Sequence, residues 1–199
     1  MGTQALGVAA DPASAKLELR RRLRALRRRL AAARPNAGAD AAAHAPPHLA
    51  ARARVIAAYH PVGAEIDPLP LARALVAQGG ADLALPVTVD RESPLEFRLW
   101  TADMVLEPDA LGASAPPADA PRVRPDLVIT PLLAFDRFGG RLGQGGGHYD
   151  RTLEALRASG PVLVLGLAFA GQEVDRLELD AHDQRLDALL TETGYMEFE

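Results

Sequence analysis

Two apolar runs, joined through a glycine-rich loop and a helical segment, constrain the fold of this chain more than any other feature. The first run, PDLVITPLLAF, covers residues 125–135, and the second, PVLVLGLAFA, covers 161–170. Between them, six glycines fall within positions 138–147 and a helical pattern, HYDRTLEALRASG, occupies 148–160. Apolar strands connected through a helix pair in parallel and need cover on both faces. This unit therefore predicts an α/β fold with a mainly parallel sheet.

The rest of the chain continues the alternation of strands and helices. Strands are predicted at 54–60 and 81–87, and an edge strand at 94–100, where polar and apolar residues alternate. Helices are predicted at 16–33 and 67–80. The remaining segments are predicted as a partly helical stretch interrupted by Pro46-Pro47 (39–53), a long connection (107–125), and a short terminal helix or loop (182–192).

One domain, residues 1–199, is expected from the length and from the lack of an internal repeat or a long linker, with residues 1–15 as a flexible N-terminus. In open α/β sheets the ligand crevice lies beyond the carboxyl ends of the strands. The loops at 60–67 and 136–149 both leave such ends. We therefore expect these two loops to meet at the binding site.

Composition limits the classes of protein to be considered. The chain has no cysteine, which excludes a disulfide framework, a thiolate zinc site and a cysteine nucleophile, and fits a reducing compartment. The first residues carry no basic leader before their short apolar run, so a signal peptide is not expected. Residues 161–172, the longest charge-free apolar segment near the C-terminus, are too few to span a bilayer. A soluble cytoplasmic protein without membrane contact is the resulting expectation.

Charge is distributed unevenly along the chain. Residues 16–34 hold nine basic residues against one acidic residue, a balance of +8, whereas the whole chain has a net charge of −4. A basic segment on an acidic body favours one local anionic partner. Lys16 and Arg20 lie four apart on one face of the predicted helix, and most of the other arginines are expected to form a solvated face. An arginine-rich RNA-binding helix is the alternative, although no RNA-recognition motif accompanies it.

The glycine loop has two possible explanations. It matches neither G-x-x-x-x-G-K-[ST] nor the dinucleotide fingerprint. Consecutive glycines let backbone N–H groups converge at a helix N-terminus, which makes a phosphate cradle, and Arg141 would add a bidentate donor. The alternative is a tight turn that needs positive φ at two or three positions. The six glycines of GGRLGQGGG exceed what such a turn requires, which favours anion binding.

Three acidic residues each have both a structural and a functional explanation. Asp150, in the first turn after the glycines, is either a partner of the helix dipole or, beside bound phosphate, a ligand of Mg²⁺. Asp183 could be the second carboxylate, although surface loops often carry aspartate. Glu65 follows a strand, and would either solubilise an exposed loop or, if buried, accept paired N–H donors from a heterocycle. Sequence alone slightly favours the exposed position for Glu65.

Together these residues resemble the 5-formyltetrahydrofolate cyclo-ligase family, also called methenyltetrahydrofolate synthetases. FDRFGGRLGQGGGHYDR (135–151) is similar to the family signature FDxxGxRLGxGGGYYDR. The supporting matches follow in order along nearly the whole chain: KLELR (16–20), EID (65–67), ALPV (84–87), LEFRLW (95–100) and HDQRLD (182–187). The resemblance implies a three-layer α/β/α fold with a mainly parallel, Rossmann-like open sheet of the NagB/RpiA/CoA-transferase-like type.

The resemblance also implies an activity and a set of site residues. The reaction is the ATP- and Mg²⁺-dependent closure of 5-formyltetrahydrofolate to 5,10-methenyltetrahydrofolate, with ADP and phosphate released through a phosphorylated formyl intermediate. Catalysis is assigned by analogy to Lys16, Arg141 and Asp150, and Mg²⁺ to Asp150 and Asp183. The ATP site comprises Lys16, Leu17, Glu18, Leu19, Arg20, Arg141, Leu142, Gly143, Gln144, Gly145, Gly146, Gly147, His148 and Tyr149. The folate site comprises His60, Glu65, Gln144, Gly145, Gly146, Gly147 and His148.

Two positions depart from the family pattern. His148 stands where an aromatic Tyr or Phe is usual, and His60-Pro61 replaces a more usual aliphatic. A ligase-like protein that binds folate without turnover is therefore a third hypothesis, for which His148 is the only indication. The expected partners are ATP and 5-formyltetrahydrofolate, with or without a polyglutamate tail, and not nucleic acid. A monomer is expected because no apolar docking helix is evident.

Overall fold

The computed structural model describes residues 12–198. Residues 1–11 of the predicted flexible N-terminus lie outside the described residues, and helix α1 (Pro12–Ala33) begins earlier than the helix predicted from residue 16. Among residues 12–198, no helix is long and apolar enough to cross a membrane.

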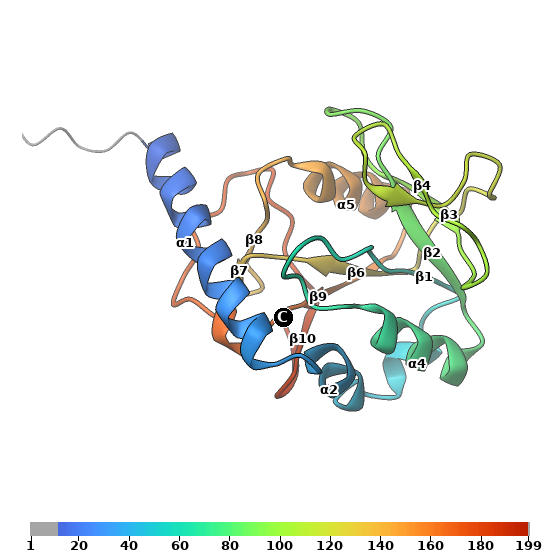
Figure 1. The fold of residues 1–199 in the computed structure, drawn as a ribbon, viewed down its shortest axis with the longest axis horizontal. Helices are drawn as coiled ribbons and strands as arrows, with labels where there is room; N and C mark the ends of the chain where they lie inside the picture. Colours follow the sequence, from blue (N-terminus) through green and yellow to red (C-terminus); the bar gives the residue numbers. More distant parts are fainter. Residues whose placement is uncertain (1–11, 199) are drawn as a thin grey trace, which may run out of the picture.

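A seven-stranded sheet in the order β11-β10-β9-β6-β1-β2-β3 forms the centre of the fold (Figure 1). Strands β2, β1, β6, β9 and β10 pair in parallel, while β3 and β11 run antiparallel at the two edges. The predicted mainly parallel sheet and the edge position of the 94–100 strand are confirmed. The strands are β1 (Val55–Ala57), β2 (Asp82–Val87), β3 (Glu96–Leu99), β6 (Leu127–Pro131), β9 (Leu163–Leu167), β10 (Ala188–Thr191) and β11 (Gly194–Glu197).

Helices cover both faces of this sheet, which makes three layers. Helices α2 (Ala37–Ala43), α3 (His48–Ala51) and α4 (Leu69–Gly79) lie on one side, and α5 (His148–Ser159) lies on the other (Figure 1). Successive residues of one strand point to opposite layers: Ile129 belongs to the core cluster shared with α4, whereas Val128 belongs to the cluster shared with α5. Apolar side chains on both faces explain why the central strands read as continuous apolar runs.

The C-terminal prediction is partly wrong. Residues 182–192, expected as a short helix or loop, contain strand β10, whose four residues are all buried. Ala188 and Leu190 belong to one core cluster and Leu189 belongs to the other, so both faces of β10 are covered. Its short apolar run could therefore not be told from a short helix by periodicity. The predicted strand at 125–135 is also divided, because β6 ends at Pro131 and a separate two-residue strand follows.

Short elements connect these layers. The small strands form two hairpins, β4 (Glu107–Pro108) with β5 (Ser114–Ala115) and β7 (Ala134–Phe135) with β8 (Arg141–Leu142). A 3-10 helix, η1 (Ala170–Gln172), follows β9. The second hairpin turns the chain after β6 back toward the sheet, so the glycine loop starts from β8 and enters α5.

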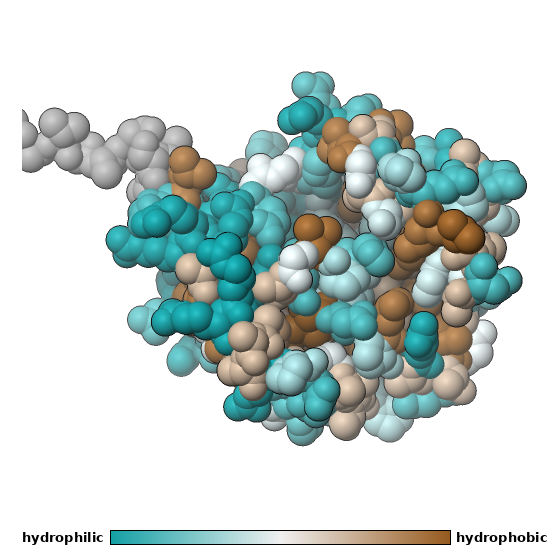
Figure 2. Space-filling view, viewed as in Figure 1, coloured by the Kyte–Doolittle hydropathy of each residue, from teal (hydrophilic) through white to brown (hydrophobic). Residues whose placement is uncertain are grey.

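Helix α1 lies along the side of the molecule (Figure 1), and hydrophilic residues cover its outer face (Figure 2). Its apolar stripe packs on the body through Leu23, which is 6% exposed and clusters with Leu133 and Ala134. The helix predicted at 16–33 is confirmed. Successive turns of α1 therefore face the loops at the carboxyl ends of β1 and β6.

Candidate active site

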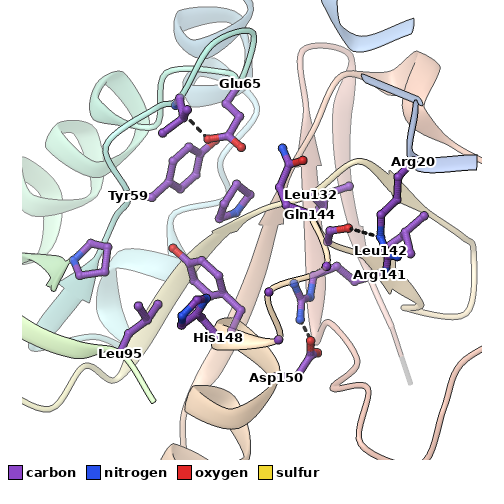
Figure 3. Close-up of a pocket in the computed structure, with 18 of the residues that line it drawn as sticks. Arg20, Tyr59, Glu65, Leu95, Leu132, Arg141, Leu142, Gln144, His148 and Asp150 are labelled. Carbon is purple, nitrogen blue, oxygen red and sulfur yellow. Dashed lines mark hydrogen bonds and ion pairs between the residues drawn. The ribbon is translucent and has the colours of Figure 1, made fainter. Parts of the chain in front are cut away.

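A cavity of about 600 Å³ opens where the loops after β1 and β8 meet α1. The loops at 60–67 and 136–149 meet here, as the crevice rule predicted. The structure brings nearly all the predicted site residues into its lining: Lys16, Arg20, His60, Glu65, every residue from Arg141 to Asp150, and Asp183. In Figure 3, Glu65 and Tyr59 lie at one end, Arg20, Arg141 and Asp150 lie at the other, and Gln144 lies between them.

Three predicted nucleotide-binding residues lie outside this lining. Leu17 is 63% exposed and Leu19 is 39% exposed. Glu18 accepts hydrogen bonds from Arg21 and Arg22 on the outside of α1, and these bonds lower its pKa to about 2. Only Lys16 and Arg20 of the KLELR segment face the cavity, because residues four apart share one face of a helix.

The glycine loop satisfies the requirement of a tight turn and also closes around the cavity. Gly145 and Gly147 have φ of +104° and +68°, a region that side chains disfavour. A Cβ on Gly145 would lie 3.3 Å from the guanidinium carbon of Arg20. Arg20 Nε donates to the carbonyl of Gly143 at 3.2 Å, so α1 and the loop are in contact. Gly147 precedes the first residue of α5, which places the positive end of that helix at the cavity.

At the same end, Arg141 and Asp150 form a short ion pair. Arg141 Nη2 lies 2.5 Å from Asp150 Oδ1, and the two side chains are 2% and 25% exposed. The Nε of Arg141 is buried and has no hydrogen-bond partner within residues 12–198. A buried guanidinium with an unsatisfied donor beside a glycine loop is suited to bind an anion.

Asp183 and Asp180 extend this charged end of the cavity. Lys16 Nζ lies 2.6 Å from Asp180 Oδ2, and this hydrogen bond lowers the pKa of Asp180 and raises that of Lys16. Asp183 Oδ2 accepts from the backbone N–H of Asp180 at 2.7 Å. Asp150 Oδ1 accepts from the backbone N–H of Gln184 at 3.1 Å, which brings the predicted metal ligands into one neighbourhood.

The donor set fits Mg²⁺ only together with a ligand that brings more oxygen atoms. No group of three or more His, Cys, Asp or Glu side chains able to hold a metal occurs in the described part of the chain. Asp150 and Asp183 each use one carboxylate oxygen in the hydrogen bonds that residues 12–198 form, which leaves the other oxygen of each for a cation. Mg²⁺ is usually held by one or two carboxylates plus substrate phosphates, and this pair meets that requirement.

Glu65, at the other end of the cavity, is buried rather than exposed. Its side chain is 7% exposed, so the solubilising role that sequence alone slightly favoured is wrong. Its Oε1 lies 3.1 Å from Arg27 Nη1, and its Oε2 accepts from the backbone N–H of Val62 at 3.0 Å. Sequence reasoning missed Arg27, which was grouped with the solvated arginines but is 6% exposed. Its position on the Leu23 face of α1 was the available signal.

Tyr59, which is buried, and Tyr149, which is partly buried, lie near this carboxylate. The hydroxyl of Tyr59 donates to the carbonyl of Ile66 at 2.6 Å. Burial, followed by the negative charge of Glu65, raises the pKa of both Tyr59 and Tyr149, so both remain neutral phenols at neutral pH. Tyr59 was predicted only as part of a strand. The Glu65 end is therefore aromatic and apolar around one fixed negative charge.

The two histidines that depart from the family pattern lie on the rim of the cavity. His148 Nε2 lies 3.2 Å from the backbone carbonyl of Asp90, which ties the start of α5 to the loop after β2. His60 is exposed and follows Tyr59 in the loop after β1. Both histidines line the cavity, and neither departure from the family pattern changes Lys16, Arg20, Arg141, Asp150 or Asp183.

A sequence model of the 5-formyltetrahydrofolate cyclo-ligase family matches residues 12–192. The chain belongs to this family. The match covers the glycine loop, α1 and both ends of the cavity. The expected enzyme class, a cyclo-ligase of this family, is thereby confirmed.

Relatives in the family carry the same name. The 5-formyltetrahydrofolate cyclo-ligase of Haemophilus influenzae is 33% identical over 144 residues, which covers 70% of this chain and 76% of the relative. That of Mycolicibacterium smegmatis is 30% identical over 145 residues, covering 69% and 73%.

Solved structures of methenyltetrahydrofolate synthetases share the fold of this cyclo-ligase family member. The NMR structure of the Aquifex aeolicus 5,10-methenyltetrahydrofolate synthetase has a TM-score of 0.70 at 28% identity, covering 92% of this chain and 93% of that one. The Mycoplasma pneumoniae 5,10-methenyltetrahydrofolate synthetase has a TM-score of 0.62 at 22% identity, covering 89% and 98%. The three-layer α/β/α fold expected from the resemblance is confirmed.

Proposed function

We propose that this protein uses ATP and Mg²⁺ to convert 5-formyltetrahydrofolate into 5,10-methenyltetrahydrofolate, with release of ADP and phosphate. One observation carries the proposal: a single cavity has a cationic glycine-loop end and an aromatic end around Glu65. Such a cavity can hold a triphosphate and a heterocycle in contact. Family membership supports the same reaction.

The chemistry requires the formyl oxygen to become a leaving group. Transfer of the γ-phosphoryl group of ATP to that oxygen forms a phosphorylated formyl intermediate and ADP. N10 of the folate then attacks the formyl carbon, the ring closes, and the C–O bond breaks to release phosphate. The protein's part in such transfers is to position phosphates and stabilise charge.

The residues at the charged end match those tasks. Arg141, with its unsatisfied Nε, donates to phosphate oxygens, and Lys16 and Arg20 approach from α1. Asp150 and Asp183 hold Mg²⁺, which supplies positive charge to the phosphate oxygens when bound. Arg141 and Asp150 pair with each other, so nucleotide binding would exchange this ion pair for contacts of both residues with the ligand and its metal.

The residues at the aromatic end orient the folate. Glu65 accepts N–H donors of the pterin, and Tyr59 and Tyr149 provide an apolar wall. Gln144 of the glycine loop lies between the two ends (Figure 3), so we expect the formyl group and the γ-phosphate to meet beside it. The preference for polyglutamylated folate, the monomeric state and the cytoplasmic location stay predictions.

An absorbance assay tests the reaction. Purified protein with ATP, Mg²⁺ and 5-formyltetrahydrofolate is expected to produce the methenyl absorbance near the ultraviolet–visible border, and reactions without ATP or without Mg²⁺ serve as controls. No absorbance change between about pH 6 and 8 would contradict the proposal. Folate binding without turnover would instead identify a folate store or sensor.

Nucleic-acid binding has less support from the arrangement of α1. Arg20 and Arg24 donate to the backbone of the glycine loop, and Arg27 is buried against Glu65. These three arginines contact the glycine loop or Glu65 and are not part of an outer basic surface. Oligonucleotide binding with a steep salt dependence would be the observation in favour of that alternative.

A further inference from the structure

Arg27 occupies an unusual position for an arginine in a basic surface helix. Its side chain is 7% exposed, as is that of Glu65, and the two are joined at 3.1 Å. Arginine is rarely buried unless it is paired, because removing its charge from water is unfavourable. The ion pair explains why this side chain, unlike its exposed neighbours Arg28 and Arg29, lies inside the protein.

The contacts of Arg27 connect two loops at the carboxyl ends of neighbouring strands. Its Nη1 donates to Glu65, in the loop after β1, and also to the backbone carbonyl of Leu132, directly after β6, at 3.2 Å. Strands β1 and β6 are paired in parallel, so this guanidinium links the two loops that form the floor of the aromatic end. Glu65 and Leu132 line the cavity, whereas Arg27 lies behind them and does not.

Glu65 is consequently a fixed acceptor. Arg27 holds Oε1 and the backbone N–H of Val62 holds Oε2, so the carboxylate has one orientation before any ligand arrives. Burying a carboxylate without an opposite charge is unfavourable, and Arg27 supplies that opposite charge at 3.1 Å.

We propose that Arg27 is a positioning residue for folate binding, which acts through Glu65 by compensating its charge and holding its carboxylate oriented toward the cavity. This inference rests on the proposed function. Arg27 lies eleven residues after Lys16 on the same face of α1, about 16 Å further along the helix. One face of α1 therefore contacts the proposed nucleotide site near the start of the helix, and it positions Glu65 for folate nearer the end of the helix.

The test separates a positioning role from a merely structural one. Arg27→Met is expected to raise the KM for 5-formyltetrahydrofolate on the order of tenfold or more, with the KM for ATP and the kcat at saturating folate changed by less than about twofold to threefold. Arg28→Met, the same substitution at an exposed neighbour, is the matched control and is expected to change none of these. A loss of α1 packing would instead raise both KM values and lower Tm.

Two further variants keep the test decisive if Arg27→Met folds poorly. Arg27→Lys retains the positive charge with a single donor group, so its folate KM is expected to fall between those of the wild type and Arg27→Met. In a Glu65→Gln background the charge is absent, so Arg27→Met is expected to add less than about twofold to the folate KM.

Each outcome has a distinct meaning. An active wild type whose folate KM is unchanged in Arg27→Met would overturn this inference and leave the proposed function standing. Equal increases in the KM for ATP and for folate would assign Arg27 to the attachment of α1 alone and would also overturn it. A wild type without turnover would overturn the proposed function first, and the inference with it.

Discussion

Replacing Asp150 by asparagine separates the two partners that this carboxylate serves in the proposed mechanism. Asp150 neutralises Arg141 at 2.5 Å, and the guanidinium is 2% exposed. With nucleotide bound, Asp150 is proposed to hold Mg²⁺ instead. Asparagine keeps the shape and one acceptor oxygen but loses the charge, so Asp150→Asn tests the charge alone.

The effect on stability follows from the burial of the pair. Breaking a fully buried ion pair by removing one partner costs about 3–5 kcal/mol. Asp150 is 25% exposed, and asparagine can still accept a hydrogen bond, so we expect a loss of about 1–3 kcal/mol. For a chain of this length, about 2 kcal/mol lowers Tm by about 4–8 °C. Calorimetry on the ligand-free protein measures this change.

Nucleotide affinity is expected to change in opposite directions with and without the metal. In EDTA, Asp150→Asn removes a carboxylate that repels the triphosphate and releases Arg141, so ATP should bind about as tightly as to the wild type or up to tenfold more tightly. With Mg²⁺, the variant lacks a metal ligand, so ATP should bind on the order of tenfold more weakly, and turnover should be lost.

Isothermal titration of ATP in the two buffers gives the decisive comparison, with wild type alongside. If Asp150→Asn weakened ATP binding equally in EDTA and in Mg²⁺, the carboxylate would have no role in holding the metal. If ligand-free stability were unchanged, the Arg141 pair would contribute nothing measurable. Either result would refute the corresponding part of the reasoning.

Three other perturbations have defined outcomes. Gly145→Ala, where φ is +104° and the Cβ would approach a guanidinium on α1, should weaken ATP binding on the order of tenfold, while Gly194→Ala, with open space around it, should not. The Lys16 hydrogen bond holds the pKa of Asp180 below 3.8, so the pair stabilises the protein above that pH and is lost as pH falls through the lowered value. Lys16→Met should return the carboxyl midpoint, followed by NMR, toward 3.8. Asp136→Ala leaves three backbone N–H groups without their acceptor and should lower Tm by about 6–12 °C, measured by thermal denaturation.

Local sequence patterns were sufficient for most of the fold. The alternation of apolar runs with 3.6-residue periodicity located β1, β2, β6, β9, α4 and α5, because central parallel strands need apolar residues on both faces. The same reasoning failed at β10. Three apolar residues and a threonine among charged residues have no period of their own, and only the neighbouring strands β9 and β11 make that segment a strand.

The sequence identified individual residues of the site but not the contacts between them. The glycine loop, Arg141 and Asp150 stand close together in the chain, so a motif could identify them. The ion pair between Arg141 and Asp150, however, follows from the β7–β8 hairpin, which places the arginine side chain beside the first turn of α5. Residues nine apart in sequence have no fixed relation until that turn exists.

The sequence by itself determined the chemistry that this protein carries: a glycine loop at a helix N-terminus, a basic helix and a set of carboxylates, all expressed in short segments. The tertiary structure alone decided which of those charges are neutralised internally. Arg27 and Glu65 are 38 positions apart, and Arg20 and Gly143 are 123 apart. Burial and pairing depend on contacts across the fold, and such contacts turn a solvated arginine into a buried counter-charge.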